Sequence, residues 1–134
     1  MPELDELTPG SPAEWLRHAF SDLELAGIPL PPKVLPETLC FHAQQAAEKA
    51  LKAVLVAHGV SVPRTHNLRT LVDLLPPDLV PPLDVQEAVG LTDYAVASRY
   101  PGAIEAVEEE DRQEAVSLAE AVVYWAEQVV RRMP

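Results

Sequence analysis

The sequence lacks most of the features that mark secreted, membrane or phosphate-loop proteins. It holds one cysteine, which excludes a disulfide within the chain and suits a reducing cytoplasm. Its five glycines are scattered, so there is no glycine-rich phosphate loop. No apolar run approaches the roughly 20 residues of a membrane-spanning helix. The acidic start of the chain has no signal-peptide pattern. We therefore expect a cytoplasmic protein with no membrane partner.

Cations are also scarce, with 10 Lys and Arg against 21 Asp and Glu, and the net charge is −11. This balance argues against a nucleic-acid partner, because phosphate backbones bind to clustered cations. Residues 33–69 are the exception: five cations and two carboxylates give that segment a net charge of +3. The segment is either a solvated helix face, a small anionic site or a docking surface for an acidic partner.

The apolar residues recur at helical spacing, and no segment alternates as a β-strand does. A chain of 134 residues is expected to form one domain, over residues 11–134, after a flexible acidic N-terminus over residues 1–10. The sequence predicts an all-α fold, an up-and-down four-helix bundle with an additional short helix. The predicted helices cover residues 11–27, 36–58, 66–75, 83–98 and 108–132.

Local signals set the expected ends of these helices. Ser11 is a good capping residue, and Pro12 suits the first helical position. Gly59 is expected to end the long helix in a left-handed conformation. Thr65 is the expected cap of the short helix that follows.

The predicted long helix has two different faces. One is rich in small residues, which allow a neighbouring helix to pack closely, within the chain or between two copies. The other carries His42, Gln45, Lys49 and Lys52 at spacings of three, four and three, so the four can face the same way. Two lysines and a histidine could hold phosphate. The alternative is an exposed, solvated helix face.

Two further positions are candidates for ligand binding. His66 is expected in the first turn of a helix, where free backbone N–H groups and Arg64 could bind an anion. The alternative for His66 is a local capping arrangement. Arg99 and Tyr100 end the fourth predicted helix, and Arg99 could bind a ligand carboxylate or phosphate. The alternative for Arg99 is a structural ion pair with Asp93 or Glu105.

The remaining chemical signals are weak. Cys40 is expected to be a buried structural cysteine, because its neighbour His42 lies on another face of the helix. The four histidines show no spacing that would place two ligands on one helix face, so we expect no metal and no cofactor. No Ser/His/Asp arrangement follows from the spacing.

Three motifs together resemble a prokaryotic HEPN domain of the nucleotidyltransferase-associated type. The first is the run from Cys40 to Lys52, CFHAQQAAEKALK, followed by Gly59. The second is Pro63-x-Thr65-His66-x-Leu68, and the third is Arg99-Tyr100-Pro101. The resemblance covers roughly residues 12–131. It implies a helical bundle that is usually a homodimer and is often encoded beside a minimal nucleotidyltransferase. It also implies a likeness to the substrate-binding domain of aminoglycoside nucleotidyltransferases.

Some relatives of this type are toxins in toxin–antitoxin pairs and cleave RNA without a metal. Those ribonucleases carry an Arg, four to six residues and then a His, and no Arg in this sequence has a His at that distance. The leading interpretation is therefore a non-catalytic module that binds a nucleotide or substrate and partners a nucleotidyltransferase. A ribonuclease toxin with a non-standard site and a dimeric interaction protein without a ligand are the alternatives. The candidate ligand-binding residues are His42, Gln45, Lys49, Lys52, His66, Arg99 and Tyr100.

Overall fold

The computed structural model describes residues 10–97 and 105–133, and over these ranges the regular elements are all helices. The predicted all-α bundle is confirmed. The expected flexible terminus lies almost entirely outside the described residues. The helices are α2 (Pro12–Ala26), α3 (Pro36–Ala57), α4 (Leu68–Asp73), α5 (Leu83–Glu87), η1 (Ala88–Thr92), α6 (Asp93–Ala97) and α7 (Glu109–Arg131).

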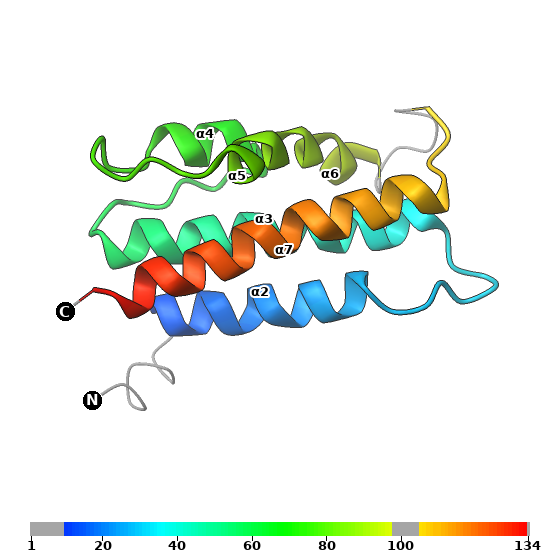
Figure 1. Cartoon of the computed structure of the whole chain (residues 1–134), viewed down its shortest axis with the longest axis horizontal. Coiled ribbons are helices and arrows are strands. Elements are labelled where there is room, and N and C mark those ends of the chain that lie inside the picture. The colour runs from blue at the N-terminus through cyan, green and yellow to red at the C-terminus, as the bar shows by residue number, and fades with distance from the viewer. Residues whose placement is uncertain (1–9, 98–104, 134) are drawn as a thin grey trace.

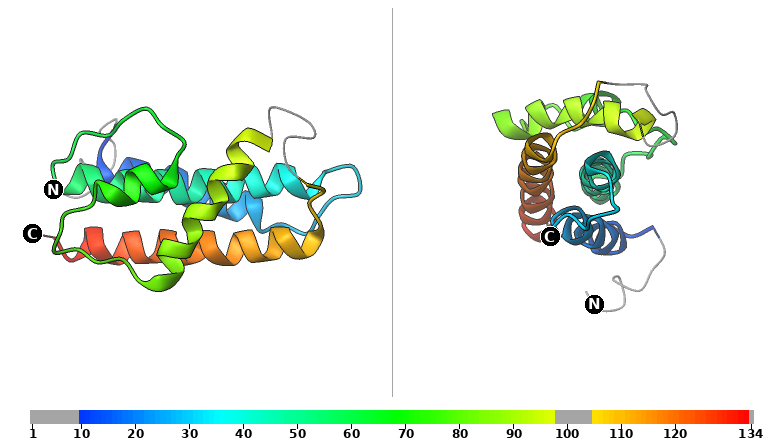
Figure 2. Two further views of the ribbon diagram at one scale, coloured as in Figure 1. Left: turned by 90° about the horizontal axis from the view of Figure 1, so that it is seen from above. Right: turned by 90° about the vertical axis from the view of Figure 1, so that its right-hand side faces the viewer.

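Helix α3 is the centre of the molecule, and it contacts α2, α7, α4, η1 and α6. The three long helices α2, α3 and α7 lie side by side (Figure 1). The segment from α4 to α6 covers the side of α3 and α7 that is opposite to α2 (Figure 2). Polar side chains on α3 therefore have protein on several sides.

The central part of the small-residue face of α3 is buried inside the chain. Ala43, Ala46, Ala47, Ala50 and Ala53 have no exposed surface. Small side chains allow the neighbouring backbones to come close, and the larger Leu and Val residues fill the space beside them. No helix among the described residues is long and apolar enough to cross a membrane.

The predicted ends of the two first helices are confirmed. Ser11 Oγ accepts a hydrogen bond from the Glu14 backbone N–H at 3.2 Å. Gly59 has a φ of +74°, which is the left-handed conformation. The Val60 N–H reaches the Leu55 carbonyl at 2.9 Å, and the Gly59 N–H reaches the Val56 carbonyl at 3.0 Å. These are the two bonds of a Schellman motif, which satisfies carbonyls that the helix leaves open.

The predicted start of the short helix at 66 with Thr65 as its cap is wrong. The cap is Asn67, whose Oδ1 accepts hydrogen bonds from the backbone N–H groups of Arg69 at 3.0 Å and Thr70 at 3.4 Å. The Thr65 hydroxyl instead accepts a hydrogen bond from the backbone N–H of Asn67, the residue just before the helix begins. Asparagine and threonine both cap well, so local sequence does not separate them.

The predicted continuous helix over 83–98 is also wrong, because this stretch forms α5, η1 and α6 in succession. The Thr92 hydroxyl donates to the Val89 carbonyl at 2.8 Å and accepts from the Leu68 N–H at 3.0 Å. A hydroxyl that bonds to the backbone in this way competes with regular helix bonds. Gly90 lowers helix propensity at the same place. The 3₁₀ helix η1 is therefore consistent with the hydrogen bond that Thr92 makes to the first residue of α4.

Candidate functional site

The polar row of α3 divides between a half-buried and a buried carboxylate rather than forming one surface. The first carboxylate is Asp22, from the facing side of α2. His42 Nδ1 lies 3.0 Å from Asp22 Oδ1, and Lys49 Nζ lies 2.6 Å from Asp22 Oδ2. Asp22 therefore neutralises one of the two lysines that were expected to bind an anion.

The second carboxylate is Glu48, on α3 itself. Lys52 Nζ donates to Glu48 Oε2 at 2.8 Å, and His66 Nδ1 lies 2.8 Å from Glu48 Oε1. The Gln44 and Gln45 amides also donate to Glu48 Oε1, at 3.1 and 3.4 Å. Burial by itself would raise the pKa of Glu48, but the hydrogen bonds from Lys52, His66 and Gln44 and the charge of Lys52 lower it below its ordinary value.

The row is not the exposed, solvated helix face that was the alternative. The side chains of Lys52 and Lys49 are only 9% and 24% exposed. His42 and Gln45 are half-buried. Charged groups lose hydration when they are buried, so they need the partners that Asp22 and Glu48 provide.

His66 lies beyond the ends of the helices rather than in the first turn of one. It precedes the cap Asn67, so the prediction that His66 lies in the first turn of a helix is wrong. The Gln44 amide donates to the His66 carbonyl at 3.0 Å, and this bond ties the connector to α3. The His66 side chain is half-exposed and Arg64 is exposed. Arg99 and Tyr100 lie outside the described residues.

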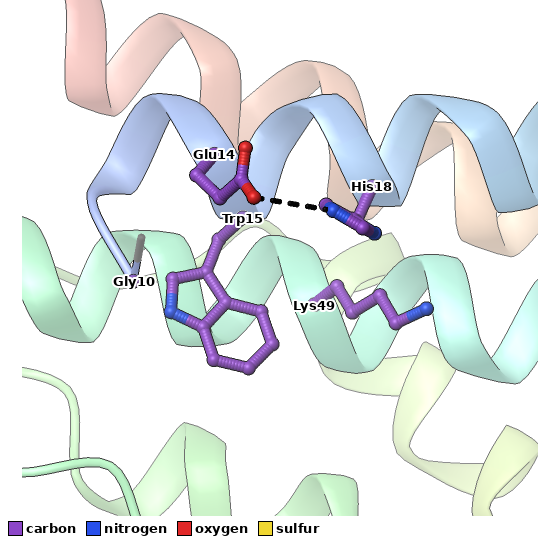
Figure 3. A pocket seen from close by; sticks show the side chains of 5 residues that line it. All are labelled: Gly10, Glu14, Trp15, His18 and Lys49. Atoms are coloured by element: carbon purple, nitrogen blue, oxygen red, sulfur yellow. Dashed lines mark ion pairs between the residues drawn. The ribbon is translucent and has the colours of Figure 1, made fainter. Parts of the chain in front are cut away.

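A pocket of about 240 Å³ opens between the first turns of α2 and the middle of α3. Figure 3 shows the Trp15 indole forming one wall and the Lys49 side chain another, with Glu14 and His18 above them. Glu14 pairs with His18 at 3.4 Å and with Arg17 at 3.6 Å. Lys52 does not line this pocket, but its Nζ lies over the Trp15 ring, 5.5 Å from the ring centroid.

Comparison with known proteins identifies the fold. A family model for the HEPN domain matches residues 12–129, nearly the whole chain. The chain belongs to the HEPN domain family. Protein TT1696 from Thermus thermophilus superposes with a TM-score of 0.79 and 32% identity, over 90% of this chain and 98% of that one. ST0689, an archaeal HEPN homologue, superposes with a TM-score of 0.67 and 28% identity over the same shares. No curated protein matches the sequence.

The resemblance read from the three motifs is thus confirmed at the level of the family. In this HEPN chain Cys40 has no exposed surface, as expected. Burial raises the pKa of the Cys40 thiol to about 11, although a hydrogen bond with Tyr94 opposes the rise. Such a thiol stays protonated and unreactive at neutral pH. Among the described residues no group of three or more His, Cys, Asp or Glu side chains could hold a metal ion.

Sequence reasoning missed the residues that organise the site. Glu48 could have been found, because Gln44, Glu48 and Lys52 recur every four residues and so share one helix face. Asp22 gives no such local signal, since its partners are 20 and 27 residues away. Arg112 was also missed: it is buried, pairs with Glu109 and donates to the Ala26 carbonyl at 3.0 Å.

Proposed function

We propose that this HEPN chain is a non-catalytic module that binds a nucleotide or a similar anionic substrate and partners a minimal nucleotidyltransferase. The observation that carries the ligand-binding part is the pocket where Trp15 and Lys49 meet. The partnership rests on the family resemblance. A pocket of about 240 Å³ lies below the roughly 300–1,000 Å³ of sites for drug-sized ligands, so it admits one ring system and leaves the rest of the ligand at the surface.

The pocket's chemistry suits the two halves of a nucleotide. An indole is a stacking platform for a base, because every base has a flat aromatic face. The ammonium of Lys49 is a point charge that binds phosphate oxygens. In the structure that ammonium is held by Asp22, so an incoming phosphate competes with the Asp22 carboxylate for Lys49.

This competition gives a test in which two substitutions should change the nucleotide affinity in opposite directions. Lys49→Met removes the cation and should weaken nucleotide binding roughly tenfold to a hundredfold, since a charge-assisted hydrogen bond contributes about 1.5–3 kcal/mol. Asp22→Asn removes the competing carboxylate and should strengthen binding roughly fivefold, the equivalent of about 1 kcal/mol of relieved repulsion. Affinities are measured by calorimetry with ATP and with base-free ribose 5-phosphate.

The matched control for the charge change is Lys33→Met, because Lys33 is an exposed lysine in the connector between α2 and α3. It should leave the affinity unchanged. Equal affinities for the wild type and the Lys49→Met and Asp22→Asn variants would mean that Lys49 is not in the site. No heat with any nucleotide would favour an interaction protein without a ligand.

A ribonuclease with a non-standard site is the second candidate, and one observation favours it. The buried Glu48 carboxylate orients a half-exposed imidazole through His66 Nδ1, and a carboxylate that orients a histidine is a common arrangement in acid–base catalysis. The purified protein is incubated with RNA beside a His66→Gln variant. Cleavage that His66→Gln abolishes would establish this function, and intact RNA with the wild type would exclude it.

Two broader parts of the proposal concern partners. We expect the chain to form a homodimer and to act beside its nucleotidyltransferase, in some settings as one half of a toxin–antitoxin pair. Light scattering gives the mass of the protein alone. Co-expression with the neighbouring nucleotidyltransferase then tests for a stable complex and for relief of any growth arrest.

A further inference from the structure

A second hollow lies on the other side of α2, between that helix and α7. It has a volume of about 450 Å³. Its apolar walls come from Leu23, Ile28, Pro29 and Val116, and Gly27 lines it where α2 ends. Tyr124 borders it and is 49% exposed. Because the Trp15 pocket lies on α2 and α3, this α2–α7 groove is a separate surface.

The charged residues that line the α2–α7 groove are Glu24 and Glu120 alone. Both are exposed, and neither belongs to an ion pair within the described parts of the chain. Two open carboxylates beside an apolar floor complement a cation that carries an apolar body.

Tyr124 is suited to anchor such a partner. Its ring packs edge-to-face on Phe20, with 5.7 Å between the ring centroids, so contacts within the chain already restrict it. A restricted aromatic side chain loses little conformational entropy on binding, and tyrosine is common among the residues that dominate interface energies.

We propose that the α2–α7 groove binds a basic amphipathic segment of a partner protein. The segment would place an apolar side chain against Leu23 and Val116, with arginines or lysines facing Glu24 and Glu120. A second copy of this chain fits less well, because a twofold contact across the groove would bring its acidic rim onto the same rim of the other copy. This inference does not depend on nucleotide binding.

The test uses a labelled synthetic helical peptide in which leucines on one face are flanked by arginines, and fluorescence anisotropy with the full chain. We expect saturable binding that weakens as salt rises, because exposed charge pairs are screened. Glu24→Gln with Glu120→Gln should lower the affinity roughly threefold to tenfold. Tyr124→Ala should lower it about tenfold. The same peptide with glutamates in place of arginines should not bind.

The control must separate the groove from the overall negative charge. Glu87→Gln with Glu110→Gln removes the same number of charges at exposed positions on α5 and α7, outside the groove. This variant should bind the peptide as the wild type does. Equal losses in both double variants, or no binding by the wild type, would overturn the proposal. A dimer that Tyr124→Ala dissociates would also overturn it, by showing that a second copy fills the groove.

Discussion

Glu48 shows how a single buried charge depends on its partners. Its side chain is 4% exposed, and burial works against ionisation of the carboxyl group. The hydrogen bonds from Lys52, His66 and Gln44 outweigh burial and hold its pKa below the ordinary value of 4.5. A depressed pKa means that Glu48 stabilises the fold above the unfolded pKa and that this stability is lost as the pH falls through the folded pKa.

The pH dependence of folding should therefore report on Glu48. We expect the wild-type free energy of unfolding to fall as the pH drops below about 4.5, and Glu48→Gln to reduce that slope. At neutral pH, Glu48→Gln should cost about 3–5 kcal/mol, because Lys52 keeps a buried charge without a counter-ion. Urea unfolding at a series of pH values measures both effects.

Two variants serve as controls for that prediction. Glu110 is exposed, so Glu110→Gln should keep the wild-type slope. Combining Glu48→Gln with Lys52→Met removes both charges of the pair and should recover part of the lost stability. A double variant as unstable as Glu48→Gln alone would show that the hydrogen bonds, rather than the charge of Lys52, dominate.

The same residues show what sequence reasoning could reach at the site. Helical spacing places His42, Lys49 and Lys52 near one another, because that spacing depends only on the helix. It cannot say that Asp22 on another helix neutralises Lys49, since that contact depends on how α2 and α3 pack. A polar row on one helix therefore indicates a cluster, and its net charge follows only from the tertiary partners.

At the scale of the elements, the end of α3 depends on the left-handed Gly59. A side chain at a positive φ is strained, so Gly59→Ala should cost about 1–2 kcal/mol although no atom lies within 4 Å of the added Cβ. Gly90 has the same open space and no positive φ, so Gly90→Ala should be neutral or slightly stabilising. Thermal unfolding of both variants gives the comparison, and equal losses would contradict the argument.

The long helices could be predicted, whereas the start of α4 and the breaks between α5, η1 and α6 could not, for a physical reason. Helices α2, α3 and α7 carry many apolar residues at one spacing, so their signal accumulates over several turns. The segment from α5 to α6 contains a 3₁₀ turn whose hydrogen bonds reach α4 through Thr92. A tertiary hydrogen bond of this kind overrides the local helical pattern of residues 83–98.

At the scale of the whole molecule, the excess of carboxylates has few cations left to balance it. At least six of the ten Lys and Arg residues are already in ion pairs: Arg17, Lys49, Lys52, Arg69, Arg112 and Arg131. Most of the 21 acidic residues therefore repel one another across the surface of a chain with a net charge of −11.

Salt should consequently raise the melting temperature at neutral pH. Going from about 0.01 M to about 0.15 M NaCl shortens the Debye length from about 30 to about 8 Å, which screens the repulsion between distant carboxylates. The ion pairs of Asp22 with Lys49 and of Glu48 with Lys52 are partly buried, so salt weakens their attraction less. Near the isoelectric point of about 4.6 the effect should vanish, because the net charge is gone. Scanning calorimetry at neutral pH and near the isoelectric point measures the change in melting temperature with salt. A melting temperature that falls with salt at neutral pH would show that surface ion pairs outweigh the repulsion.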